Sequence, residues 1–233
     1  MNKAQLEQLQ QELAQKVIIP DIGTDYQPLP KHTIFSFDIQ YTPEKAYVAI
    51  DVQTYGGKEL GVFVGVTDIP TAYIPGLFCF REGPPLLAVL NHVQKVIGIS
   101  ADLLIVDGHG LAHPRLFGAA CWLGVQSDLP TIGCAKRPLI KYNGYLGQDR
   151  GDKVPIFVKG QMVGYGLRTQ DTIKPLYVSV GHKISLDTAA DVILKLASMY
   201  RVIEPIRRAD QAARAYAKGE TYPNTQFLGK IEI

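Results

Sequence analysis

The stretch DLLIVDGHG occupies residues 102–110 and contains the feature that decides the fold. Its apolar run, residues 103–106, leads directly into Asp107, which is followed by Gly108, His109 and Gly110. A short continuous apolar run is typical of a strand that is buried on both faces of a sheet. The carboxylate and the glycines behind it have two interpretations. They form either a tight turn after the strand or part of an active site.

The segments on either side of this run alternate between strand and helix patterns. Three strands joined by short links are expected at residues 33–42, 45–55 and 58–68, which favours antiparallel hairpins. In the first of these, Phe35, Phe37 and Ile39 share one face, and Ser36, Asp38 and Gln40 share the other. Apolar spacing predicts helices at 4–18, 84–97, 114–127, 185–200 and 208–219. Further strands are expected at 130–136, in a pair over 155–169, and at 175–182.

This order of elements predicts an α/β fold with a mixed sheet flanked by helices, and among the few topologies that remain, one attractive solution is a ribonuclease H-like arrangement. No repeat or linker interrupts residues 1–233, so we expect one domain. In that arrangement the first strand lies beside the strand that follows the first core helix. The topology therefore predicts that Asp38 lies next to Asp107, although no local motif links the two residues.

Composition limits the classes of protein to which the chain can belong. Of 233 residues, 46% are hydrophobic and 20% are charged, which is ordinary for a globular protein, and no apolar run has the length of a membrane span. The polar N-terminus lacks the apolar core of a signal peptide, and three scattered cysteines fit a reducing compartment. We therefore expect a cytoplasmic protein with no membrane partner.

The charge is weakly basic overall and is unevenly distributed. A net charge of +2 does not establish a polyanionic partner, but the segment 201–218 carries five cations and two acids. Such a segment could face phosphates. On charge alone, a solvated helix surface is the favoured interpretation.

Three carboxylates lie next to large apolar residues, where an unpaired charge is costly. They are Asp38 in the first strand, Glu82 just before the helix expected at 84–97, and Asp107. Each has an ordinary explanation alone: Asp38 faces solvent, Glu82 serves a helix N-terminus, and Asp107 opens a turn. A fold that gathers all three weakens those explanations. A carboxylate set without cysteine predicts a site for Mg²⁺, or for Mn²⁺ in its place, that supports phosphoryl chemistry.

Other polar residues end strands near this predicted site. Lys136 ends the strand at 130–136 and could bind a phosphate or pair with a carboxylate. His182 ends the strand at 175–182 and could position or protonate a reacting group. His109 and His113 are either substrate ligands or structural histidines, and for His109 we prefer the structural role. Dinucleotide, Walker A and GxSxG motifs are absent from the sequence.

Five segments together resemble the endonuclease V family, which repairs deaminated bases. They are YIPGLFCFREGPPLL at 73–87, DLLIVDGHGLAHPRLFGAA at 102–120, PTIGCAKRPL at 130–139, VGHKISLDTA at 180–189 and YRVIEPIRRAD at 200–210. Their order and spacing match from about residue 5 to residue 215. The resemblance implies a ribonuclease H-like fold and a Mg²⁺-dependent endonuclease. It implies recognition of hypoxanthine in DNA or RNA and hydrolysis of the second phosphodiester on its 3′ side, leaving 3′-hydroxyl and 5′-phosphate ends.

The resemblance also assigns roles to individual residues. Asp38, Glu82 and Asp107 match the metal ligands, Lys136 and His182 match further active-site positions, and Asp210 matches an acid found in some members. Tyr73, Ile74 and Pro75 match a wedge that enters the duplex where the altered base leaves, and Gly76, Gly108 and Gly110 match the base pocket. His113 is a candidate substrate ligand. The sequence departs from the family pattern at two places. Ala72 precedes the wedge where the family usually has proline. Ile39 and Gln40 follow Asp38 where the family usually has small residues, and Gln40, on the same strand face as Asp38, lines the metal site or contacts substrate.

Two other functions remain open at this point. The chain could be a nucleic-acid binder that has lost its chemistry, although the intact carboxylates and Lys136 argue against that. It could also be a nuclease of the same fold without base preference. The motifs do not distinguish DNA from RNA, because that choice depends on contacts to the 2′-hydroxyl. We expect a monomer.

Overall fold

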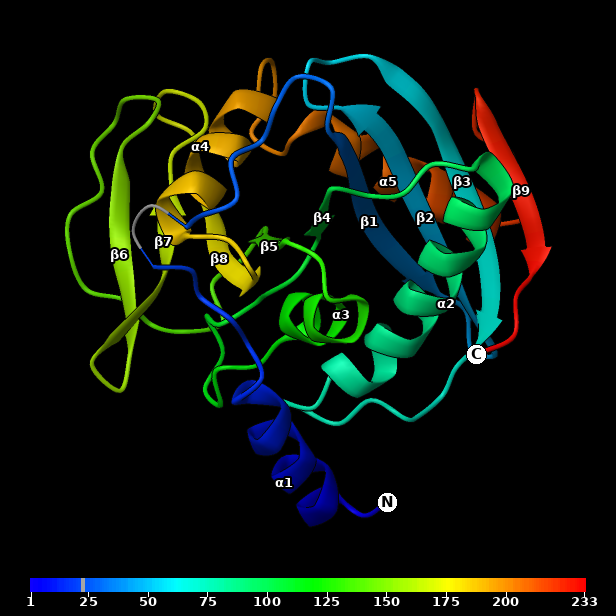
Figure 1. The fold of residues 1–233 in the computed structure, drawn as a ribbon, viewed down its shortest axis with the longest axis horizontal. Helices are drawn as coiled ribbons and strands as arrows, with labels where there is room; N and C mark the ends of the chain where they lie inside the picture. Colours follow the sequence, from blue (N-terminus) through cyan, green and yellow to red (C-terminus); the bar gives the residue numbers. More distant parts are fainter. Residues whose placement is uncertain (22–23) are drawn as a thin grey trace.

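The structure, a computed structural model, describes residues 1–21 and 24–233. Within them, nine strands form one mixed sheet in the order β6-β7-β8-β5-β4-β1-β2-β3-β9 (Figure 1). The strands are β1 (Thr33–Tyr41), β2 (Lys45–Thr54), β3 (Glu59–Asp68), β4 (Leu103–Val106), β5 (Thr131–Ala135), β6 (Lys153–Val158), β7 (Gln161–Leu167), β8 (Leu176–His182) and β9 (Thr225–Lys230). The mixed sheet and its helices confirm the predicted fold class.

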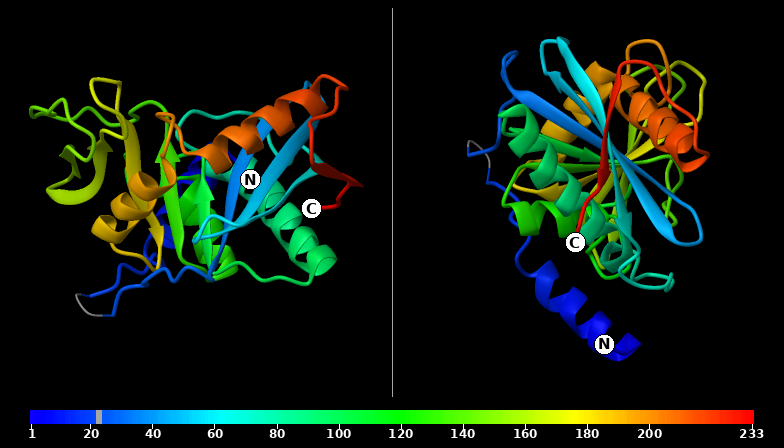
Figure 2. Two further views of the ribbon diagram at one scale, coloured as in Figure 1. Left: turned by 90° about the horizontal axis from the view of Figure 1, so that it is seen from above. Right: turned by 90° about the vertical axis from the view of Figure 1, so that its right-hand side faces the viewer.

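Helices cover both faces of this sheet. They are α1 (Lys3–Ala14), α2 (Cys79–Ile97), α3 (Ala119–Ser127), α4 (Leu186–Leu196) and α5 (Glu204–Ala217). The small residues Ala209, Ala212 and Ala213 of α5 pack on Ala49 and Val64. Helix α2 lies on the opposite face from α5 (Figure 2). Its apolar residues pack against Phe35, Phe37 and Ile50. Burial of the central strands on both faces explains why their patterns are so apolar.

The predicted neighbourhood of the first strand is confirmed. β1 pairs with β2 in antiparallel register and with β4 in parallel register, and the last β1–β4 pair joins Phe37 to Val106. The next residue on each strand is Asp38 and Asp107. The backbone amide of Asp107 donates to the carbonyl of Phe37 over 3.1 Å. The two carboxylates therefore leave the sheet side by side.

Helices α2 and α3 each begin at another place than the sequence predicts. α2 begins at Cys79, so Glu82 lies in its first turn rather than before it, and Pro84 and Pro85 lie inside the helix. Proline is favoured at a helix start, which is why the expected boundary fell too late. α3 begins at Ala119 rather than at Pro114, because Leu116 takes a left-handed conformation with φ of 56° that interrupts a helix.

The ends of the chain also differ from expectation. α1 ends at Ala14, so Val17 lies outside it, while α4 ends at Leu196 and α5 begins at Glu204. The edge strand β9, which pairs in parallel with β3, is absent from the sequence interpretation. None of its residues is buried and it contains Gly229 at φ of 72°, so it lacks the apolar alternation that marks a strand. Among the described residues, no helix has the length and apolarity of a membrane span.

Candidate active site

Four acidic side chains from four elements meet near the end of the β1–β4 pair. Asp38 comes from β1, Asp107 follows β4, Glu82 lies in the first turn of α2, and Asp210 lies on α5. Asp38 and Glu82 are only 6% and 5% exposed, which excludes the solvent-facing interpretation of Asp38. The Asp38 and Asp107 carboxyl groups are within hydrogen-bonding reach of each other, and both act electrostatically on Glu82. The fold thus gathers the three predicted carboxylates and adds Asp210.

Lys136 supplies a positive charge to this group of acids. Its ammonium lies 2.6 Å from Asp107 Oδ2 and 3.5 Å from Asp210 Oδ1. Lys136 directly follows β5, and β5 lies parallel to β4, so both side chains leave the sheet at the same edge. Of the two sequence-based roles for Lys136, the structure displays the pairing with a carboxylate. Although burial opposes ionisation, the acids around it raise the pKa of Lys136 above its usual value.

Burial and mutual repulsion disturb the ionisation of the acids. Burial, followed by the nearby Asp107, raises the pKa of Asp38 to about 8. Burial raises the pKa of Glu82 well above its usual value, and the charges of Asp38 and Asp107 add to that effect. The Lys136 ammonium and the Arg214 guanidinium together carry too little positive charge for four ionised carboxylates. The site therefore favours a further cation or retained protons.

The residues present fit a hard divalent cation by their chemistry. All the acids offer oxygen ligands, and the Glu82 carboxylate has no hydrogen-bond or ion-pair partner among residues 1–21 and 24–233. Within the same residues, no three His, Cys, Asp or Glu side chains are already closed around one metal position. The Lys136 ammonium lies among the acids and attracts Asp107. Ligation of a cation would therefore require the carboxylates to reorient around it.

Gln40 and Arg214 complete the polar contacts of the acids. The Gln40 amide nitrogen donates to Asp38 Oδ2 over 3.0 Å and to Asp210 Oδ1 over 3.4 Å. Arg214, one helical turn after Asp210 on α5, donates to both of its oxygens over 2.9 Å. Gln40 therefore lies at the carboxylate group, as expected from its strand face, and links β1 to α5.

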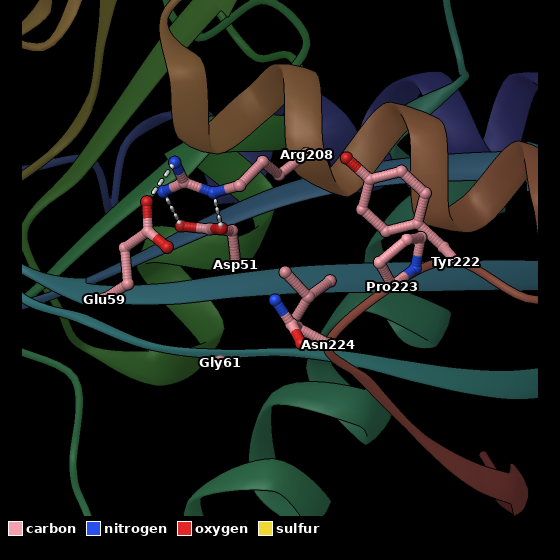
Figure 3. A pocket seen from close by; sticks show the side chains of 8 residues that line it. Asp51, Glu59, Gly61, Arg208, Tyr222, Pro223 and Asn224 are labelled. Atoms are coloured by element: carbon pink, nitrogen blue, oxygen red, sulfur yellow. Dashed lines mark hydrogen bonds and ion pairs between the residues drawn. The ribbon is translucent and has the colours of Figure 1, made fainter.

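A buried ion pair fixes α5 against the sheet two residues before Asp210. Figure 3 shows the Arg208 guanidinium reaching from α5 to Asp51 and Glu59. It donates to Asp51 over 2.5 and 3.1 Å, to Glu59 over 2.8 Å and to the Gln53 side chain over 2.7 Å. Asp51 is buried, and burial raises its pKa to about 6 although Arg208 lowers it. These contacts set the position of α5 and hence of Asp210.

A cavity of about 790 Å³ opens beside the acids. Glu82 and Asp107 line it together with residues from the segments before α2, between β4 and α3, and after β5, including the first residues of α2 and α3. These residues are Tyr73, Gly76, Phe78, Cys79, Gly108, His109, His113, Pro114, Gly118, Ala119, Arg137, Pro138 and Leu139. The cavity is therefore continuous with the acidic site and largely apolar elsewhere. A flat, uncharged ring with a polar edge fits such walls.

The predicted wedge lies at the rim of this cavity. Tyr73 is 62% exposed, and its ring contacts Phe78 edge to face with centroids 5.5 Å apart. Ile74 is half-buried and Pro75 is exposed, and neither is a wall residue. Gly76 is a wall residue with φ of 78°. An exposed aromatic ring on a turn can stack against bases without losing any packing inside the protein.

The two glycines around His109 have different surroundings. Gly108 lines the cavity, and a methyl group added there would meet only Val106 and Ala119, at 3.6 and 3.9 Å. Gly110 is buried against β8, where an added methyl group would lie 2.0 Å from the Val180 carbonyl oxygen. Its amide already donates to Ser179 Oγ over 2.8 Å. Gly110 therefore packs against β8 and is not a wall residue of the cavity, whereas the sequence places it in the base pocket.

Of the two histidines of this loop, His113 is buried and His109 is half-buried. Burial, with the Arg115 charge, lowers the pKa of His113 to about 4, and its Nδ1 accepts from the Arg115 amide over 3.1 Å. His113 still lines the cavity, so its ring can contact a ligand by its face or edge. The His109 Nε2 lies 3.1 Å from the Arg137 carbonyl oxygen. That bond ties the cavity wall to the loop after β5.

His182 does not join this site, which corrects the sequence-based interpretation. β8 is antiparallel to β5, so His182 pairs with Thr131 at the start of β5 while Lys136 follows its end. Five residues at roughly 3.3 Å each place His182 about 16 Å from Lys136. The His182 ring is buried, accepts from the Ile18 amide over 3.2 Å and lies 3.5 Å from Asp128. The strand direction, which sequence alone leaves open, decides this placement.

Sequence reasoning missed three residues that shape the site. Phe78 and Arg137 are cavity walls, and they lie inside the family segments 73–87 and 130–139. Gln10 of α1 is 0% exposed and bonds to two backbone carbonyls of the cavity loops. Its spacing from Leu6, Leu9 and Leu13 places it on the apolar stripe of the helix. A polar residue in such a stripe was the signal that could have identified it.

Comparison with known proteins identifies related sequences. A model of the family described as Endonuclease V matches residues 11–211. An endonuclease V from Dictyoglomus turgidum is 39% identical over 202 residues, covering 86% of this chain and 85% of the relative. The match therefore includes all four acids and the residues of the cavity.

Solved structures are similar to this fold over nearly its whole length. A crystal structure of the endonuclease V from Streptomyces avermitilis has a TM-score of 0.84 and 33% identity, with 94% of each chain covered. The endonuclease V of Ciona intestinalis has a TM-score of 0.80 and 26% identity, covering 93% of this chain and 98% of that one. The Ciona protein is in complex with a 24mer DNA that contains an inosine followed by a ribo-adenosine.

Proposed function

The chain belongs to the endonuclease V family, and from this premise we propose that it cuts nucleic acid strands containing hypoxanthine. The reaction is metal-dependent hydrolysis of the second phosphodiester on the 3′ side of the altered base. It leaves 3′-hydroxyl and 5′-phosphate ends. The observation that carries this proposal is the continuity between a carboxylate group and a base-sized cavity, which share Glu82 and Asp107 as walls.

The acids hold the cation in this proposal. Asp38, Glu82 and Asp107 are its ligands, with Asp210 as a fourth candidate, and the raised pKa values of Asp38 and Glu82 reflect the positive charge that the site needs. When bound, Mg²⁺ supplies charge neutralisation at the phosphate and lowers the pKa of water. Once the Asp107 carboxylate reorients toward the bound cation, the Lys136 ammonium can donate a hydrogen bond to a phosphate oxygen. Arg214 and Gln40 hold Asp210 and Asp38 in orientation.

The cavity receives the base that leaves the stack. The backbone amides of Gly76 and Gly108 have no hydrogen-bond partner among the described residues, and both residues are cavity walls. Hypoxanthine carries acceptors on the edge where adenine carries an amino group, so free amide donors favour it over adenine. Tyr73, at the rim, is placed to fill the vacated stack. Discrimination between the two bases is thus a matter of donors and acceptors rather than size.

Cleavage of an end-labelled strand tests this function. Matched oligonucleotides carry one inosine or one adenine at the same position and are incubated with Mg²⁺ or with EDTA. The expected result with a 5′-labelled inosine strand in Mg²⁺ is one product, whose 3′-hydroxyl end lies one nucleotide beyond the lesion, and no product in EDTA. Equal cutting of both strands would instead identify a nuclease without base preference. Tight binding without cutting would identify a non-catalytic binder.

The same assay distinguishes the nucleic acid that the enzyme uses. DNA and RNA strands of one sequence, each with a single inosine, are compared under equal conditions. Because a 2′-hydroxyl adds one donor and one acceptor beside each phosphate, the ratio of the two rates reports contacts that the protein makes there.

A further inference from the structure

We propose that Gln10 of α1 is a positioning residue for recognition of the altered base, and that Arg115 acts with it. This inference rests on the proposed function. α1 projects from the rest of the molecule, with only its later turns against the body (Figure 2). Its single fully buried polar side chain among the described residues of the helix is Gln10, which is 0% exposed. The contacts of this side chain are all with the cavity loops.

The Gln10 amide group links two of the segments that line the cavity. Its nitrogen donates to the Gly76 carbonyl over 3.1 Å and to the Phe117 carbonyl over 2.7 Å. The same nitrogen lies 3.6 Å from Cys79 Sγ. Gly76 and Cys79 belong to the segment that carries the wedge, and Phe117 directly precedes Gly118, a lining residue from a second segment. One side chain therefore ties these two segments of the cavity lining together.

Arg115 holds the same carbonyl from the other side. Its Nη2 donates to the Gly76 oxygen over 2.6 Å, its Nε donates to Gln10 Oε1, and its Nη1 lies 3.6 Å from Glu7. A methyl group on Gly76 would lie 2.6 Å from Arg115 Nη2, so the glycine allows this approach. The orientation of the Gly76 carbonyl is consequently fixed by two donors.

Fixing that carbonyl fixes the recognition surface. The peptide planes on either side of Gly76 connect the exposed Tyr73 turn to the buried start of α2, which contains Glu82. If the Gln10 donor is lost, only Arg115 still holds this carbonyl, and the turn can rotate at Gly76, where glycine tolerates either sign of φ. The wedge and the free Gly76 amide would then no longer be aligned with Gly108 and Asp107. The acids themselves make no contact with Gln10 and would stay in place.

This separation predicts an unusual kinetic result. Gln10→Glu keeps the size of the side chain and its bond from Arg115 but removes both amide donors, and Gln10→Leu removes all polar contacts. Both variants are expected to raise KM for the inosine strand about tenfold and to lower the inosine-to-adenine ratio of kcat/KM by a similar factor, with kcat within about threefold. Fluorescence of 2-aminopurine next to the inosine, which reports unstacking, should fall in parallel.

Leu13→Ala is the matched control on the same helix. Leu13 is buried in the apolar core and has no polar contact with the cavity loops, so its truncation loosens α1 without removing the two donors. It is expected to lower the unfolding temperature while leaving the ratio between the two bases unchanged. If Gln10→Leu does not fold, Gln10→Glu carries the test.

The outcomes separate this inference from the proposed function. A wild-type protein that shows no preference for inosine overturns the proposed function and the role of Gln10 with it. A wild-type preference that persists in both Gln10 variants, or that falls equally in Leu13→Ala, overturns the role of Gln10 alone. Loss of preference confined to the Gln10 variants, with kcat retained, supports the positioning role.

Discussion

The Lys136 ammonium lies 2.6 Å from Asp107 and occupies the centre of a group of acids that exceeds it in charge. Asp210 is also within 3.5 Å of this ammonium, while Asp38 and Glu82 are buried beside Asp107. The Lys136 ammonium and the Arg214 guanidinium together carry less charge than four carboxylates. We propose that a cation completes this arrangement and leaves Lys136 free to contact a phosphate.

Replacing a ligand carboxylate by its amide tests that interpretation. Asp38→Asn and Asp107→Asn keep the size of the side chain but remove an anionic oxygen ligand. Each is expected to lower single-turnover cutting of an inosine strand by about a hundredfold or more while affinity for that strand stays within about threefold. Cutting is measured on gels and affinity by fluorescence polarisation in EDTA. Glu220→Gln, an exposed acid beyond α5, is the control for charge alone. Rates near wild type for Asp107→Asn would refute the ligand assignment.

The raised pKa of Asp38 predicts how stability depends on pH. In the folded protein without metal this pKa is about 8, against 3.8 for an unperturbed carboxyl group, so the folded state binds the proton more tightly. Its stabilising contribution is present below about pH 4 and is lost as pH rises toward 8. In EDTA, Asp38→Asn is therefore expected to raise the unfolding temperature at pH 8.5 by about 4 °C or more relative to wild type.

The stabilising effect of a divalent cation should instead increase as the pH rises. Mg²⁺ competes with the proton for the same carboxylates, so its stabilising effect on the wild type should be larger at pH 8.5 than at pH 5.5. Differential scanning fluorimetry in Mg²⁺ and in EDTA measures both effects. An equal Mg²⁺ effect at the two pH values would place the cation away from Asp38.

The central site could be predicted from sequence because topology and local pattern agreed there. Alternation in residues 33–42 and the apolar run before Asp107 placed both acids, and the strand order made them neighbours. Glu82 was recognised, but its helix begins earlier than the prolines indicate. His182 was misplaced because a strand pattern carries no direction, and Gln10 was missed because its partners are backbone atoms of distant loops. Contacts of that kind leave no periodic pattern in a sequence.

The place of His182 gives a direct test of strand direction. His182→Asn keeps an acceptor for the Ile18 amide and lies about 16 Å from Lys136 by strand geometry. We expect cutting within about threefold of wild type and a lower unfolding temperature, because the replaced ring is buried. Steady-state kinetics and calorimetry provide the two values. A folded variant with a hundredfold lower kcat would return His182 to the active site.

Arg208, which fixes α5 against the sheet, has a buried partner, Asp51, and an exposed partner, Glu59. We expect their removal to lower the free energy of unfolding by unequal amounts. Asp51→Ala leaves the Arg208 charge without its buried partner, which is expected to cost about 3–5 kcal/mol of unfolding free energy. Glu59→Gln removes the exposed partner of the same guanidinium and should cost about 1 kcal/mol or less. Urea unfolding measures both. Equal losses would contradict the view that the buried pair, rather than total charge, fixes α5.

Gly108 and Gly110 separate recognition from folding within one loop. Alanine at Gly108 meets only Val106 and Ala119, at ordinary contact distances, so Gly108→Ala should unfold within about 2 °C of wild type. Its methyl group would nonetheless lie on the cavity wall and is expected to raise KM for an inosine strand about tenfold. Alanine at Gly110 would lie 2.0 Å from a carbonyl oxygen of β8, so Gly110→Ala should lower the unfolding temperature by about 10 °C or more.

The contrast between these two variants decides what the loop does. If Gly108→Ala bound and cut the inosine strand as the wild type does, the base would not approach this wall, whatever the stability of the variant. If Gly110→Ala instead folded normally and lost only recognition, the packing of Gly110 on β8 would be wrong. Only the combination of a stable, weakly binding Gly108→Ala and an unstable Gly110→Ala fits a loop in which one glycine admits the base and the other admits β8.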